Sequence, residues 1–262
     1  SIGGEGSPNN VGYATYLDLR DRSRTFDAMA AVRSWQPTLE TGGVAELVPA
    51  MRVSANYFSM LGVQMSRGRA FLPEEELPGR GVQVAVVSYS YWQRHNLDPG
   101  VLGSEILING RPFTIVGIAP REFIGTSQLV SMDVWTPLSA YDVVNGPQQE
   151  AGKTFGDGKG EELMIHARLK PGVSAAAIRP QLEGLAANLE KAFPVEQKDQ
   201  TFTTTPVPRL SISTSPQNDN EMSALAPMLL GMSAVVLVVA CLNLANMLLA
   251  QGMARRKEIA IR

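Results

Sequence analysis

Cysteine and histidine are scarce in this sequence of 262 residues, which contains one cysteine, Cys241, and two histidines, His95 and His166. A single cysteine excludes an intramolecular disulfide framework and any metal site built from several thiolates. The histidines form no His-x-x-x-His pair, and neither has a cysteine beside it in the sequence. We therefore expect neither a metal site nor a bound cofactor.

An excess of charge of one sign is lacking as well. The chain has 23 Lys and Arg residues against 25 Asp and Glu residues, which gives a formal net charge of −2. Proteins that bind nucleic acid generally carry a clustered basic excess, so this near-balance excludes a general nucleic-acid binder.

No catalytic motif in the sequence is complete. Gly146–Thr154 resembles a phosphate-binding loop, but five residues separate its glycines where the motif needs four. The acidic run Glu74–Glu76 follows a proline and is interpreted as a solvated face. His166 lies within an expected strand and is interpreted as a satisfied or exposed residue. We expect no catalytic residue; the alternative of a membrane-anchored enzyme would require clustered titratable groups.

Charged residues are absent over one long stretch, from Met222 to Ala254. As a helix, Leu225–Leu249 would be about 37 Å long, which exceeds the roughly 30 Å of a bilayer's hydrocarbon core. A surface helix of a soluble protein carries polar residues on one face, and this stretch does not. The pattern predicts a transmembrane helix over residues 222–251. The alternative is a helix buried in a large globular core.

The flanks of this helix differ in charge. Residues 211–221 form a polar linker, whereas residues 252–262 contain several Lys and Arg residues. Cytoplasmic flanks carry the Lys and Arg excess, so we expect residues 1–221 outside the cytoplasm and the C-terminus inside. Asn243 and Asn246 favour a helix bundle because amides in lipid need hydrogen-bond partners; otherwise they are tolerated polar residues on a lone anchor. The chain has no initiator Met, and we expect it to be part of a longer protein.

Helix and strand patterns alternate in the preceding region, which indicates an α+β fold. We predict a helix from Thr15 to Val32, a short helix capped by Ser54 and ended by Gly62, and a helix over 89–95 capped by Ser88. Asn109-Gly110 predicts a hairpin turn between the apolar runs of 105–118. Further strands are expected at 47–53, 82–87, 134–138, 163–169 and 201–207. A helix is expected after Pro171-Gly172, with Pro180 in its first turn.

Several segments, in this order, resemble the periplasmic core domain of MacB-type ABC transporter permeases. The segments are Val53–Val63, Arg67–Phe71, Val84–Ser88, Leu102–Gly110, Val116–Ala119 and Val134–Pro137. At the C-terminal end, Asn243–Ala250 and Arg255–Arg262 resemble the second membrane helix and the cytoplasmic start of FtsX-like permeases. The opening Tyr16–Arg20 further resembles the duplicated orphan branch of these permeases.

The resemblance implies a fold with two lobes outside the membrane. A porter-like α/β lobe would comprise residues 15–62 and 161–210, after a lead-in at 1–14. A mostly β, sabre-like lobe would be inserted at 63–160. One transmembrane helix would follow the linker.

The resemblance also implies a permease component with no enzymatic activity of its own, located in the bacterial inner membrane. A separate cytoplasmic ABC ATPase would drive export or other envelope work by mechanotransmission, with contact residues at Arg255, Arg256, Glu258, Ile259 and Arg262. Asn243 and Asn246 would pack against other membrane helices, in a dimer that can recruit a periplasmic adaptor. The alternatives are a regulatory FtsX-like permease that controls a cell-wall hydrolase and a lipoprotein-release permease. For the basic C-terminal flank, the alternative is a positive-inside anchor without a partner.

Overall fold

The computed structural model divides the chain into two compact units, Ser1–Gln217 and Asn218–Arg262, and each is described by itself. The residues that it describes are 2–4, 11–22, 25–41, 43–126, 130–144, 156, 163–173, 177–178, 180, 182–184, 202–204 and 219–259.

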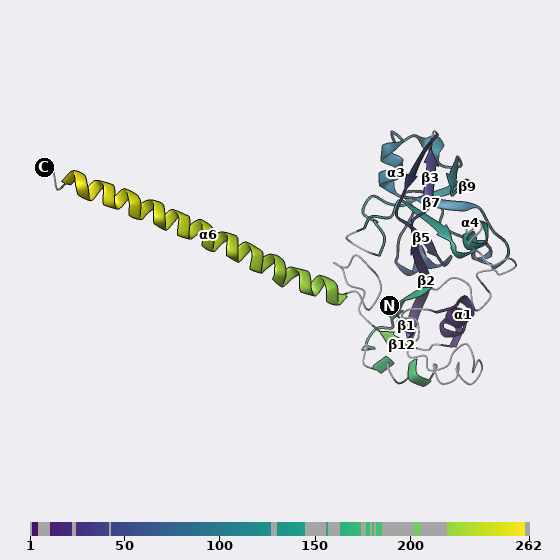
Figure 1. Ribbon diagram of the computed structural model, residues 1–262. Helices are drawn as coiled ribbons and strands as arrows, with labels where there is room; N and C mark the ends of the chain where they lie inside the picture. The colour runs from purple at the N-terminus through teal and green to yellow at the C-terminus, as the bar shows by residue number, and fades with distance from the viewer. Residues whose placement is uncertain are drawn as a thin grey trace. The chain divides into compact units, whose positions relative to one another are not determined.

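The first unit is built on a mixed sheet, which has twelve strands within the described residues. Its strand order is β12-β1-β11-β2-β5-β10-β7-β9-β8-β3-β4, with β6 paired to β9. Figure 1 labels β1, β2, β3, β5, β7, β9 and β12 among these strands. Only the pairs β5–β10 and β7–β9 are parallel among the described pairs. The strands are β1 (Ile2–Gly4), β2 (Phe26–Trp35), β3 (Thr38–Thr41), β4 (Val44–Leu47), β5 (Ala50–Val53), β6 (Arg67–Gly68), β7 (Val84–Val87), β8 (Glu105–Ile108), β9 (Arg111–Ile118), β10 (Val134–Pro137), β11 (Met164–Leu169) and β12 (Phe202–Thr204).

Short helices connect and cover these strands. In the first unit they are α1 (Tyr13–Arg22), α2 (Tyr57–Met60), α3 (Tyr89–Arg94) and α4 (Tyr141–Val144). Three single 3₁₀ turns span Pro73–Glu75, Pro99–Val101 and Leu138–Ala140. The predicted helix after Pro171-Gly172 is described in part: residues 177, 178, 180 and 182–184 are helical, so Pro180 lies within the first helical turn described.

The predicted helix over Thr15–Val32 is wrong in its second half. Helix α1 ends at Arg22, and Phe26 begins strand β2. β2 pairs with β11 on one side and with β5 on the other, and its residues from Met29 to Val32 are all buried. A strand covered on both faces has a continuous apolar run, which periodicity alone cannot distinguish from a helix.

Most of the predictions based on local turn and cap chemistry are confirmed, and the cap assigned to Ser54 is the exception. Asn109 and Gly110 adopt φ values of 49° and 72°, as a turn with positive φ at both centres requires. Ser88 caps α3 by accepting a hydrogen bond from the Tyr91 backbone N–H at 2.9 Å. Gly62 has a φ of 71° after α2, as predicted for a helix end. Pro137 lies at the end of β10, which is a central strand, so its missing N–H costs no interior ladder bond.

Side chains from β2 alternate between two cores on opposite faces of the sheet. Met29 and Ala31 pack with Tyr16 and Leu19 of α1. Ala30 and Val32 pack on the other face, where α2 contributes Tyr57 and Phe58. A third core lies among β7, β8, β9, β10 and α3. The alternation follows from the two-residue period of a strand.

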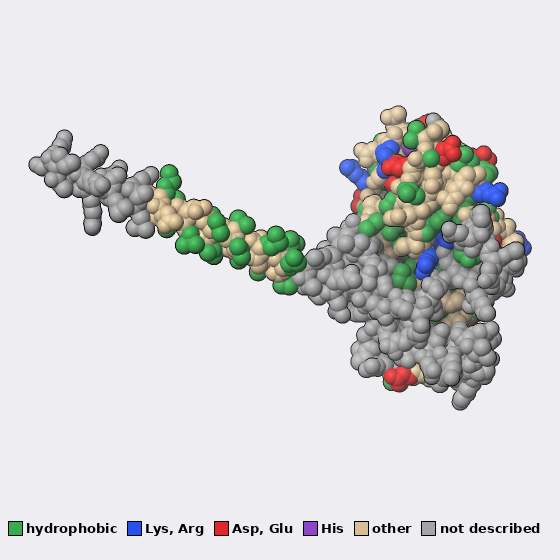
Figure 2. Space-filling model, viewed as in Figure 1, with side chains coloured by type: hydrophobic (Ala, Val, Ile, Leu, Met, Phe, Trp, Pro, Cys, Tyr) green, Lys and Arg blue, Asp and Glu red, His purple; other side chains and the backbone are tan. Residues whose placement is uncertain are grey.

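The second unit is described as one helix, α6 (Asp219–Ile259), of 41 residues. Within the described residues, one segment of a helix is long and apolar enough to cross a membrane, Pro227–Leu248, and none of its side chains is buried. Figure 2 shows hydrophobic side chains on the described part of this helix, with no Lys, Arg, Asp or Glu among them. The predicted apolar helix is confirmed, and it is not a buried core helix in this structure.

The predicted boundaries of the lobes stay predictions. The predicted boundaries assign β3 and β4 to the porter-like lobe and β8 to the sabre-like lobe. In the structure, β3 pairs with β8 through Leu39–Ile108 and Glu40–Leu107, and β4 pairs with β3. Of the predicted linker 211–221, residues 219–221 are helical and the rest lie outside the described residues. The segment Gly146–Thr154, which resembles a phosphate-binding loop, also lies outside the described residues.

Candidate functional site

Ser54 lies at the end of β5 and is bound to β2. Its hydroxyl accepts a hydrogen bond from the Ala31 backbone N–H at 3.0 Å, and its own N–H donates to the Ala31 carbonyl at 2.8 Å. Ser54 therefore does not cap the helix that follows. Asn56 occupies the N-cap position of α2, without a side-chain cap bond. The Ser54 prediction is wrong because the neighbouring strand uses its oxygen.

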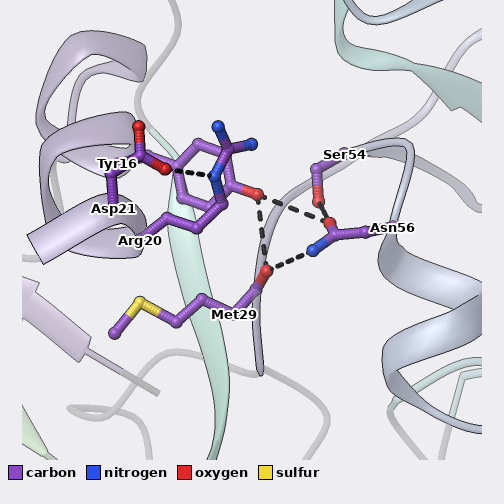
Figure 3. A network of polar contacts seen from close by, with 6 residues as sticks. All are labelled: Tyr16, Arg20, Asp21, Met29, Ser54 and Asn56. Carbon is purple, nitrogen blue, oxygen red and sulfur yellow. Dashed lines mark hydrogen bonds and ion pairs between the residues drawn. The ribbon is translucent and has the colours of Figure 1, made fainter. Parts of the chain in front are cut away.

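The side chain of Asn56, at the start of α2, connects this helix to β2 and to Ser54 (Figure 3). Its Nδ2 donates to the Met29 carbonyl at 2.7 Å, and its Oδ1 accepts from the Ser54 hydroxyl at 2.7 Å. The Tyr16 hydroxyl of α1 lies 3.4 Å from both the Met29 carbonyl oxygen and Asn56 Oδ1. Burial raises the pKa of Tyr16. These four residues form what we call the junction network, which ties α1, β2 and α2 together.

Arg20 covers the α1 side of the junction network. Its guanidinium lies 5.5 Å from the centre of the Tyr16 ring, and its Nε donates to Asp21 Oδ1 at 3.0 Å. Both side chains are drawn beside Tyr16 in Figure 3. The Arg20–Asp21 pair is largely exposed, so it contributes little to stability.

Replacement of Asn56 by Ala is expected to lower the free energy of unfolding by about 2 kcal/mol, because it leaves the Met29 carbonyl and the Ser54 hydroxyl without this partner. Ser59→Ala is the matched control, since Ser59 donates one exposed hydrogen bond to the Asn56 carbonyl. Urea unfolding followed by tryptophan fluorescence measures both. Equal effects of the two substitutions would contradict a structural role of the junction network.

The acidic run was misread as a solvated face. Glu75 and Glu76 are 6% and 5% exposed, and only Glu74 is exposed. Arg69 holds Glu75 with two bonds, from Nη1 to Oε2 at 2.9 Å and from Nη2 to Oε1 at 2.7 Å. Glu76 Oε2 accepts from the Ala55 N–H at 2.8 Å, and burial raises the pKa of Glu76. Sequence reasoning missed the Glu76 contact, because Ala55 is 21 positions away and no local spacing signals it.

His166 is a second group that sequence reasoning misjudged. It lies within β11, as predicted, but it is 2% exposed and neither ring nitrogen has a hydrogen-bond partner among the described residues. Burial lowers its pKa to about 3, so its imidazole is neutral. The prediction of an exposed or hydrogen-bonded His166 is therefore wrong for the described residues. The described residues hold no group of three or more His, Cys, Asp and Glu side chains that could bind a metal.

The residues predicted to contact other chains all fall on or after α6. Asn243 and Asn246 are three positions apart, so they share one face of the helix, and both are exposed. Arg255, Arg256, Glu258 and Ile259 lie in the last turns of α6. Arg262 lies outside the described residues. The contacts assigned to these residues stay predictions.

Comparison with known proteins agrees with this architecture. Residues 2–185 match the model of the MacB-like periplasmic core domain family. The chain is 25% identical over 214 residues to a macrolide export ATP-binding/permease protein MacB of Burkholderia thailandensis, which covers 80% of this chain and 29% of that protein. The corresponding protein of Escherichia coli K12 is 27% identical over 135 residues, or 51% of this chain and 19% of its own length. The chain therefore spans less than a third of these relatives.

Two solved structures have a similar fold. The periplasmic region of MacB from Actinobacillus actinomycetemcomitans aligns with a TM-score of 0.51 at 16% identity, over 74% of this chain and 79% of that one. The extracellular domain of the noncanonic ABC-type transporter YknZ from Gram-positive bacteria aligns with a TM-score of 0.55 at 12% identity, over 76% and 91%.

Family membership follows from the extent of the match. Such domains form a class of α+β modules that lie outside the membrane, and the mixed sheet with its helices has that fold. The chain belongs to the MacB-like periplasmic core domain family. The family resemblance and the α+β fold predicted from the sequence are confirmed.

Proposed function

We propose that this chain is the extracytoplasmic core domain and second membrane helix of an ABC-type permease. A separate cytoplasmic ATPase drives it, and the permease transmits the resulting motion to the outer domain by mechanotransmission. The observation that carries the proposal is the combination, in one chain, of the family domain with an apolar helix whose far flank is basic. The basic flank favours a cytoplasmic C-terminus and an extracytoplasmic domain.

The continuity of α6 supports a mechanical role. Its 41 residues are helical throughout, with Pro227 in the interior, and span about 60 Å, which exceeds the hydrocarbon core by several turns. The helix extends from Asp219 on the domain side of the apolar stretch to Ile259 on the basic side. A continuous helix transmits a displacement at one end to the other. The proposed ATPase contacts, Arg255, Arg256, Glu258, Ile259 and Arg262, follow the apolar stretch.

Membrane context and partners follow from the same proposal. The chain belongs to the bacterial inner membrane, where Asn243 and Asn246 bond to neighbouring membrane helices of a dimer. An ATPase binds at the cytoplasmic face, and a periplasmic adaptor is a candidate partner of the outer domain. Co-purification of a cell-wall hydrolase in place of an adaptor would favour the regulatory alternative.

Interruption of α6 tests the coupling. In the full-length protein assembled with its ATPase, Met222→Gly combined with Ser223→Gly destabilises α6 on the domain side of its apolar segment, since each glycine in a helix interior costs about 1 kcal/mol relative to alanine. We expect a spin label at Glu105→Cys, on a Cys241→Ala background, to report an ATP-dependent distance change between protomers. The glycine variant should lose this change and keep ATP hydrolysis.

The matched control is Met222→Ala combined with Ser223→Ala, which removes the same side chains but preserves helix propensity. It should retain the distance change. The proposal is contradicted if the unmodified protein shows no ATP-dependent change, or if the glycine variant responds as the alanine variant does.

A further inference from the structure

A cavity of about 460 Å³ lies beside β11, on the face of the sheet that α2 covers. Met60, Leu61 and Val63, from the end of α2 and the residues after it, form one apolar wall, and Phe123 contributes to another. The volume lies within the range of small-molecule sites, which are mostly apolar with a few placed polar groups. The cavity is partly open, so a ligand can enter from solvent.

The polar groups of this cavity include the buried imidazole of His166. His166 is paired with Ala30 of β2, whose side chain belongs to the core on the α2 side, and this pairing directs His166 to the same face. A neutral imidazole offers one N–H donor and one acceptor nitrogen. Both nitrogens lack a partner among the described residues, and a buried polar side chain in this state requires an explanation.

Thr126 brings a hydroxyl to the same cavity. It lies beside Tyr57 and Trp135, yet neither its Oγ1 nor the Tyr57 hydroxyl makes a hydrogen bond of normal geometry among the described residues. A hydroxyl can turn its proton toward a ligand without moving other atoms. The cavity therefore has a second hydrogen-bond donor, beside the Tyr57 hydroxyl and on a wall formed by a different segment from that of His166.

Arg168 supplies a positive charge at the cavity. It lies two residues after His166 in β11, so both side chains point to the same face. Its Nη2 donates to the Met60 carbonyl, which places the guanidinium beside the wall formed by α2, while the side chain is exposed. A guanidinium has five N–H donors, so this bond leaves capacity for a ligand. None of the described residues that line the cavity is acidic.

We propose that this cavity binds a small amphiphilic monocarboxylate. The hydrocarbon part packs against Met60, Leu61 and Phe123. The carboxylate accepts hydrogen bonds at the Arg168 end of the cavity, where charge-assisted bonds to a guanidinium are strongest. The Thr126 hydroxyl and one nitrogen of His166 provide further donors. The site lies on the outer domain and does not depend on coupling to an ATPase, so a negative result here leaves the proposed function intact.

Binding of [1-¹³C]decanoate to the full-length protein in nanodiscs tests this site. Carboxyl NMR shifts should reveal one saturable site per chain, in addition to non-saturable partition into lipid. Arg168→Gln should weaken the saturable binding at least about tenfold, because one hydrogen bond to a charged group is lost. Val63→Trp, which fills the cavity, should abolish saturable binding. Decanol, with the same hydrocarbon chain and no charge, should compete weakly.

Arg111→Gln is the matched control, since Arg111 is an exposed arginine at the start of β9, outside the cavity lining. It should bind decanoate as the unmodified protein does. Unfolding midpoints establish that each variant is folded. The proposal is overturned if the unmodified protein shows only partition into lipid, if Arg168→Gln and Val63→Trp both bind normally, or if decanol competes as well as decanoate.

Discussion

Replacement of Phe58 by Ala is expected to lower the free energy of unfolding of the outer unit by about 4 kcal/mol, the cost of truncating a fully buried aromatic side chain. Phe58 lies in α2 and is 0% exposed. Its ring centre lies 5.8 Å from those of both Phe123 and Trp135, and 5.2 Å from that of Tyr57. Truncation therefore removes several aromatic contacts at once and leaves a cavity in this core.

Urea unfolding measured by tryptophan fluorescence isolates this effect, because Trp35, Trp92 and Trp135 all belong to the first unit. Phe58→Leu should cost about 1 kcal/mol, since it retains most of the volume. Val44→Ala is a matched control at a side chain that is 70% exposed, and it should change stability by less than about 0.5 kcal/mol. A loss below about 1 kcal/mol for Phe58→Ala would contradict its position in the core.

Acidification is expected to destabilise the outer unit through His166. Burial lowers the pKa of this imidazole to about 3, below the ordinary value of 6.5. As pH falls below about 6.5, the unfolded chain therefore takes up a proton that the folded chain does not. The contribution is complete above pH 6.5 and disappears progressively down to about pH 3. Between pH 7 and pH 4 it amounts to about 3 kcal/mol.

His166→Phe removes this titration and keeps a ring of similar size. The difference between the unfolding free energies of the unmodified protein and this variant should therefore change by about 3 kcal/mol from pH 7 to pH 4. His95→Gln removes the other histidine and should leave that pH-dependent difference in place. A difference that stays constant over this range would show that His166 is not buried in the neutral form.

Features with local causes could be predicted from the sequence. The positive φ of Asn109 and Gly110 reflects their own preference, and the cap that Ser88 provides acts three residues along the chain. The apolar helix α6 follows from the absence of charge over residues 222–254. In each case the information lies within one contiguous stretch of chain.

Features that depend on distant pairing could not be predicted. The sequence predicts a helix for the first part of β2, because an apolar run of this kind fits a helix as well as a buried strand. Only the pairing of β2 with β5 and β11 decides in favour of the strand. Burial of Glu76 is compensated by the bond that it accepts from the distant Ala55 N–H, and His166 lies on a buried face of β11 where that strand pairs with β2. The environments of the polar residues that define the candidate sites therefore could not be predicted from the sequence.

We propose that the folded domain and the basic end of α6 lie on opposite sides of a membrane. Single cysteines at Glu105 and Arg256, introduced on a Cys241→Ala background, test it in spheroplasts that produce the full-length protein. Glu105 is an exposed residue of β8. This topology predicts that a membrane-impermeant maleimide labels Glu105→Cys in intact spheroplasts and labels Arg256→Cys only after permeabilisation. Labelling of Arg256→Cys in intact spheroplasts, with Glu105→Cys protected, would contradict it.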